Sequence, residues 1–145
     1  MVLADATSVA ICVLTCTCRA RPENALPTRL APSIARTASD ADRDLLQVYV
    51  GMNFDDPLHD DAVWKQRVNR TLRHVQYVAV HPRKRNHLPW NELLRVAYDA
   101  GHAYFVRTQD DVVFLTHNWL PRFVRALQNM NNLGVVGPTF SEGNT

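Results

Sequence analysis

Continuous apolar runs alternate along the chain with segments whose apolar residues recur at helical spacing. The runs cover residues 9–15, 46–52, 75–80 and 104–108 and are interpreted as strands. The first run is apolar on both faces, as a buried parallel strand is. The helical pattern covers about residues 28–39, 60–73, 93–100 and 118–130. This order predicts one α/β domain over residues 1–145, a three-layer α/β/α Rossmann-like fold with a mostly parallel sheet.

Local signals refine several boundaries of these elements. Asp60 and Asp61 are expected to cap the helix that follows them, and Gly101 is expected to end the third helix. The charged stretch 40–44 is interpreted as a turn, and residues 112–115 are expected to resume extended structure. Residues 134–138 are predicted to form a short last strand.

Composition and charge exclude some classes of partner. The net charge of +2 is too small to indicate a nucleic-acid partner. The sequence has no run of roughly 18 apolar residues, so we expect no transmembrane segment in this chain. The chain stops soon after a strand-like segment, which we interpret as an interruption rather than a natural end.

In open α/β sheets, ligands bind beyond the carboxyl ends of the strands, where the strand order reverses. This rule selects polar residues that follow three of the predicted strands. They are Thr15, Thr17 and Arg19 after the first, Asp55 and Asp56 after the second, and Asp110 and Asp111 after the fourth.

The adjacent carboxylates Asp110 and Asp111 are costly to bring near a core unless a cation neutralises them. A hard divalent cation shared with ligand phosphates would do so. The alternative is a solvated turn or a helix cap that uses Asp111, and composition alone favours it because acidic pairs at strand ends are common. For Asp55 and Asp56, contacts with a base or ribose and a plain turn with a cap both remain open. The basic residues 83–85 form either a solvated surface or a diphosphate contact.

Familiar nucleotide and hydrolase motifs are absent from the sequence. It has no Gly-x-Gly-x-x-Gly turn, no Walker-type loop and no Gly-x-Ser-x-Gly elbow. These absences argue against a dinucleotide-binding site, a P-loop site and a serine hydrolase site.

Residues 91–111 combine a helix of the form Asn…Ala…Ala-Gly, a strand and an acidic pair. This block resembles the centre of GT-A-fold nucleotide-sugar glycosyltransferases, which include the family 2-like enzymes. Residues 51–57, 116–119 and 134–138 resemble a group of eukaryotic and viral GT-A-like proteins. The resemblance extends over about residues 9–138. It departs from the usual Asp-x-Asp motif, because this chain reads Gln109-Asp110-Asp111.

The resemblance implies a metal-dependent transfer of a sugar from a UDP- or GDP-type donor to a hydroxyl of a glycan or protein acceptor. Asp111 would bind Mn²⁺ or Mg²⁺ directly, and Asp110 would contact the ribose or support the ion. Thr15, Thr17 and Arg19 would contact the base, with Asp55 or Asp56 opposite.

Relatives of this kind act in the Golgi lumen, and in them the acceptor half follows the segment present here. The alternative is a catalytically inactive or partial nucleotide-binding module of the same fold.

Overall fold

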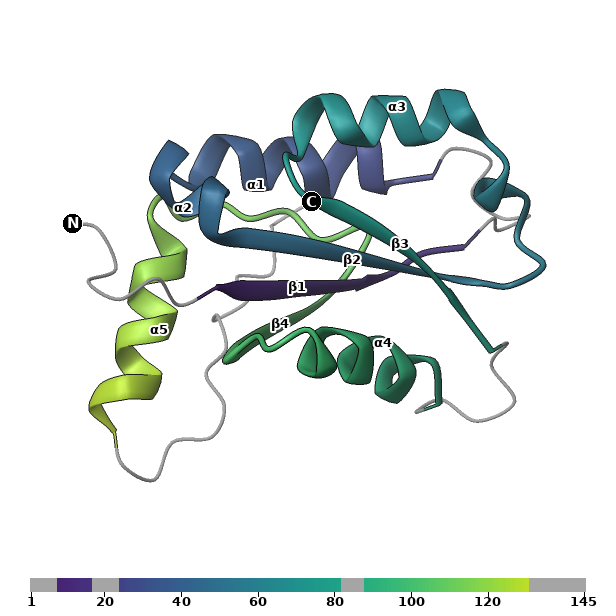
Figure 1. The fold of residues 1–145 in the computed structure, drawn as a ribbon. Coiled ribbons are helices and arrows are strands. Elements are labelled where there is room, and N and C mark those ends of the chain that lie inside the picture. The colour runs from purple at the N-terminus through teal and green to yellow at the C-terminus, as the bar shows by residue number, and fades with distance from the viewer. Residues whose placement is uncertain (1–7, 17–23, 82–87, 131–145) are drawn as a thin grey trace, which may run out of the picture.

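The computed structural model describes residues 8–16, 24–81 and 88–130, and within them the chain forms a four-stranded, all-parallel sheet. Its strands are β1 (Val9–Leu14), β2 (Leu46–Asn53), β3 (Val75–Val80) and β4 (Tyr104–Gln109), in the order β3-β2-β1-β4 (Figure 1). The predicted strands differ from these bounds by at most one residue at either end. The predicted α/β class and parallel sheet are therefore confirmed for the described residues.

Helices cover both faces of this sheet, with α1 and α3 on one face and α4 on the other (Figure 1). The helical elements follow in chain order. They are η1 (Leu26–Leu30), α1 (Ala31–Thr37), α2 (Asp40–Leu45), η2 (Pro57–His59), α3 (Ala62–Thr71), α4 (Leu88–Asp99) and α5 (Trp119–Asn129).

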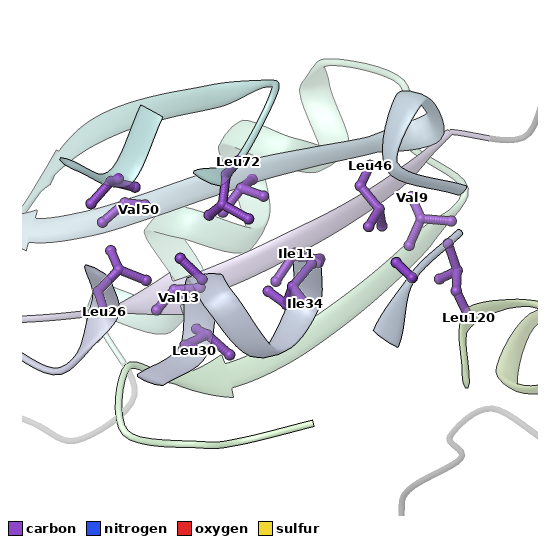
Figure 2. Packing of buried hydrophobic residues seen from close by; sticks show 14 of the residues in the cluster. Val9, Ile11, Val13, Leu26, Leu30, Ile34, Leu46, Val50, Leu72 and Leu120 are labelled. Carbon is purple, nitrogen blue, oxygen red and sulfur yellow. The ribbon is translucent and has the colours of Figure 1, made fainter. Parts of the chain in front are cut away.

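Strand β1 is buried on both faces and divides the core in two. Val9, Ile11 and Val13 point toward α1, α3 and α5, whereas the alternate residues point toward α4. Figure 2 shows Ile11 and Val13 beside side chains of η1 and α1, and Leu120 of α5 near the start of β1. This double burial explains why the strand reads as one continuous apolar run.

The first helical region differs in detail from its prediction. A π-helical turn, η1, leads directly into α1, and the amide of Ala31 bonds the carbonyl of Leu26 five residues earlier. Pro32 has no amide hydrogen and cannot bond the carbonyl of Thr28, so the regular α ladder is interrupted there. The helical run ends at Thr37, two residues before the expected end.

The predicted turn at residues 40–44 is wrong, because Asp40–Leu45 is the short helix α2. Ser39 explains the helix, since its hydroxyl oxygen accepts a hydrogen bond from the amide of Asp42 at 3.1 Å. The same hydroxyl donates to the Asp42 carboxylate at 2.6 Å, which holds the capping side chain in place. Acidic side chains in the first turn also favour the helix N-terminus.

The other boundary predictions have mixed outcomes. Asp61 caps α3 by accepting from the amide of Trp64 at 2.8 Å, and Gly101 ends α4 with a φ of 86°. The predictions for Asp61 and Gly101 are confirmed, whereas Asp60 ends η2 instead of capping α3. Residues 112–115 form no strand, because the ladder between β1 and β4 ends at Gln109. The strand predicted at residues 134–138 lies outside the described residues.

Two buried hydroxyls of α1 hold the segment that leads from β4 to α5. Ser33 Oγ accepts from the amide of Phe114 at 3.0 Å. Thr37 Oγ1 accepts from the indole Nε1 of Trp119 at 3.1 Å, and the Thr37 carbonyl accepts from the amide of Asn118 at 2.8 Å. These bonds attach the chain after β4 to the same layer that covers β1.

Replacing Thr37 with Val should lower the free energy of unfolding by about 1–3 kcal/mol, because the buried indole N–H of Trp119 loses its acceptor. Urea unfolding followed by circular dichroism measures this change. The matched control is Thr28→Val, at an exposed hydroxyl whose hydrogen bond is to the nearby carbonyl of Ala25. Equal losses in the two variants would contradict the role of Thr37.

Candidate functional site

The strand order reverses next to β1. The chain proceeds outward from β1 to β2 and β3, and then returns to the opposite side of β1 to form β4. The carboxyl ends of β1 and β4 therefore meet at a topological switch point, where α/β sheets bind ligands. Leu14 is paired with Gln109 in this register, so the next residues of the two strands, Thr15 and Asp110, become neighbours.

Thr15 and Asp110 are joined by a direct hydrogen bond. The hydroxyl of Thr15 donates to Oδ2 of Asp110 at 2.6 Å, and the Thr15 amide donates to the carbonyl of Gly51 at 3.0 Å. The Thr15 side chain is buried, and the Asp110 side chain is half-buried. Two residues that the sequence selected on separate strands are thus brought together at one point.

Asn24 extends this contact, although sequence reasoning did not select it. Its Nδ2 donates to Thr15 Oγ1 at 2.6 Å, and its Oδ1 accepts from the indole Nε1 of Trp64 at 3.3 Å. The side chains Trp64, Asn24, Thr15 and Asp110 thus form one hydrogen-bonded chain, which we call the switch-point relay. The only local signal for Asn24 was its place just before the helical run that begins at Leu26.

Asp111 follows in the turn after β4 and is half-buried. Within residues 8–16, 24–81 and 88–130 no group of three or more His, Cys, Asp or Glu side chains is close enough to enclose a metal ion. The donors at this turn are carboxylate oxygens, which suit Mg²⁺ or Mn²⁺. A cation here could therefore take only one or two ligands from the described residues, and phosphate oxygens and water would have to complete its shell.

A hollow lies along the carboxyl edge of the sheet beside Thr15. Its lining combines the ends of three strands with the first turn of α4. The lining residues are Leu14, Thr15, Cys16, Gly51, Asn53, Val80 and Pro89. A ligand in this hollow would lie over the ends of β1 and β2. Thr15, which lines the hollow, is bonded to Asp110 in the acidic turn after β4.

The acidic residues after β2 separate into two environments. Asp56 is buried and caps η2, since its Oδ1 accepts from the amide of Leu58 at 2.9 Å. This is the contact that the turn-and-cap interpretation requires. Asp55 is exposed in the turn. Thr17, Arg19 and residues 83–85 lie outside the described residues.

Sequence reasoning also did not select a histidine and a glutamate that are in contact at the carboxyl edge of the sheet. Glu92, on α4, accepts from the amide of His81 at 2.8 Å and contacts its Nδ1 at 2.7 Å. The His81 ring meets the edge of Phe54, a side chain that is 61% exposed at the end of β2. Sequence spacing could not reveal this pair, because β3 and α4 come together only in the fold.

Cys12 provides no chemistry at this site. It lies in the core beneath α4, and burial raises the pKa of its thiol to about 12. The thiol therefore stays protonated at neutral pH and behaves as a small apolar side chain.

Gly51 leaves no room for a side chain beside the hollow. A Cβ at this position would lie 2.8 Å from Cδ2 of Leu14 and 3.2 Å from Cδ2 of Leu93. Gly51→Ala should therefore cost about 1–3 kcal/mol of stability through overpacking. Thermal and urea unfolding measure the loss.

The control for Gly51→Ala is the double variant with Leu93→Ala. Truncating Leu93 removes two of the three close contacts, so the alanine at residue 51 should cost less in that background. An unchanged cost would show that packing against Leu93 does not limit this position.

No helix among the described residues has the length and apolarity needed to cross a lipid bilayer. Comparisons of the chain with models of protein families, with curated proteins and with solved structures found no match.

Proposed function

We propose that this chain is the donor-binding portion of a metal-dependent GT-A glycosyltransferase and binds a nucleoside diphosphate sugar together with Mn²⁺ or Mg²⁺. The hydrogen bond between Thr15 and Asp110 carries this proposal, because it fixes one carboxylate of an acidic pair at the switch point of a parallel sheet. The hollow beside Thr15 gives the nucleotide a place to lie. The resemblance of residues 91–111 to the centre of GT-A enzymes supplies the reaction class.

The two carboxylates have separate roles in this proposal. Asp111 binds the cation directly, and Asp110 contacts the ribose or supports the ion through its oxygen that does not contact Thr15. A bound divalent cation would neutralise the negative charge that develops on the departing diphosphate. The buried hydroxyl of Thr15 holds the Asp110 carboxylate by a charge-assisted hydrogen bond, so the acidic turn is orientated before the donor arrives.

The donor would lie across the strand ends. Adjacent strands are about 4.8 Å apart, so a diphosphate near the end of β4 would leave the nucleoside over β1 and β2. Thr15 and Asn53 line the hollow there, and the side-chain amide of Asn53 can bond ribose or base.

The transfer itself needs an acceptor as well as the donor. A glycan or protein hydroxyl oxygen forms a bond to the anomeric carbon, the bond from that carbon to the diphosphate breaks, and the hydroxyl proton passes to a base. In this proposal Thr15, Asp110 and Asp111 bind the donor and the cation that neutralises the diphosphate.

Asp111→Ala should weaken UDP or GDP binding in the presence of Mn²⁺ by about 10- to 100-fold, a typical loss for a metal-site variant. Binding without metal should change much less, because in this proposal Asp111 acts on the nucleotide through the ion. Isothermal titration calorimetry of both nucleotides, with and without Mn²⁺, measures the difference.

The control is Asp99→Asn, an exposed carboxylate at the end of α4 that is paired with Arg95 at 3.7 Å. This variant should bind nucleotide like the wild type. Wild-type affinities that are the same with and without Mn²⁺ would overturn the metal-bridged donor site. Circular dichroism of Asp111→Ala checks that the sheet remains folded.

A further inference from the structure

We propose that Asn24 and Trp64 are positioning residues that set the direction of the hydrogen bond from Thr15 to Asp110. Through that bond they leave one oxygen of Asp110 available to the donor complex. The inference rests on the proposed function, because it concerns how the same acidic turn is prepared for its ligand. Its basis is the polarity of the switch-point relay.

The amide of Asn24 has only one orientation that satisfies its neighbours. Its Oδ1 lies near two groups that can only donate, the amide of Leu26 at 3.1 Å and the indole Nε1 of Trp64 at 3.3 Å. Its Nδ2 lies near two oxygens, Thr15 Oγ1 at 2.6 Å and the Cys16 carbonyl at 3.4 Å. Exchanging the oxygen and nitrogen would make three of the four contacts unfavourable, since only the Thr15 hydroxyl could adapt by donating. The other three contacts therefore fix the orientation in which Asn24 donates to Thr15.

The direction of the next hydrogen bond follows from this donation. A threonine hydroxyl carries one proton and can rotate it toward any acceptor. Since Thr15 Oγ1 accepts from Asn24, its own proton is directed to Oδ2 of Asp110, 2.6 Å away. An ionised carboxylate can only accept, so the polarity is consistent from Trp64 to Asp110.

The relay also determines which part of Asp110 stays available. Oδ2 is used by Thr15, and Oδ1 has no hydrogen-bond partner within the described part of the chain. Trp64 anchors the other end, because its side chain is buried in the larger core on α3. The position of Asp110 thus depends on a residue in the core, through two intermediate side chains.

Asn24→Asp tests the direction of the relay with almost no change of shape. The new carboxylate can still accept from Leu26 and Trp64, but it cannot donate to Thr15. The Thr15 proton is then drawn to residue 24, and Asp110 loses its bond. We expect Mn²⁺-dependent UDP binding to fall about 10- to 100-fold, as measured by calorimetry. Mn²⁺ binding without nucleotide, followed by electron paramagnetic resonance, should weaken as well.

A double-mutant cycle with Thr15→Val separates positioning from a direct effect of the added charge. If Asn24 acts through the Thr15 hydroxyl, Asn24→Asp should cause no further loss in the Thr15→Val background. Thr15→Ser, which keeps the hydroxyl and so the bond to Asp110, should bind more tightly than Thr15→Val. A full additional loss from Asn24→Asp in the Thr15→Val background would overturn the inference.

The outcomes distinguish this inference from the proposed function. A wild-type protein whose UDP binding does not respond to Mn²⁺ overturns the proposed function. A wild type that responds, with unchanged binding in Asn24→Asp, overturns only the positioning role. If circular dichroism shows that Asn24→Asp is unfolded, the pair Thr15→Val and Thr15→Ser still tests the relay. Equal binding by those two variants would refute it.

Discussion

The parallel pairing of β1 with β2 on one side and with β4 on the other is the constraint on which the rest of this structure depends. It buries β1 on both faces and so requires helices on both sides of the sheet. The same pairing aligns Leu14 with Gln109, which makes Thr15 and Asp110 neighbours at the switch point. Core and candidate site are thus fixed by one register, because a shift by one residue would reverse the faces of β1 and separate the two side chains.

The sequence predicts the sheet well because each strand is a short, mainly apolar run, and the run of β1 is buried throughout. It predicts short helices less well, as α2 shows. Asp40–Leu45 has too few residues to show an apolar face, and its stability comes from the Ser39 cap and from packing in the fold. The π-helical turn η1 likewise depends on how Pro32 fits against the preceding turn, which hydrophobic spacing does not reveal.

Some residues of the candidate site could be selected from the local sequence, whereas others come together only through the fold. The rule that ligands bind at strand ends selected Thr15 and Asp110, and the fold places them in contact. Asn24 and Trp64 are 40 residues apart in sequence, and their contact follows from the packing of α3 beside η1. His81 and Glu92 also meet only through the fold. Asp56 was open to two interpretations because a capping carboxylate and a ligand-binding carboxylate have the same local sequence.

The switch-point relay also explains how a carboxylate can be held at the edge of an apolar core. Burying a polar group is costly unless each donor and acceptor has a partner. Three successive hydrogen bonds meet this requirement. The indole of Trp64 donates to the amide of Asn24, which donates to the hydroxyl of Thr15, which donates to Asp110. Such a chain tolerates little change, because reversing one link leaves a donor facing a donor or an acceptor facing an acceptor. The direction of these hydrogen bonds therefore also determines which oxygen of Asp110 is held by Thr15. Stability and the proposed binding role thus require the same orientation of the Asp110 side chain.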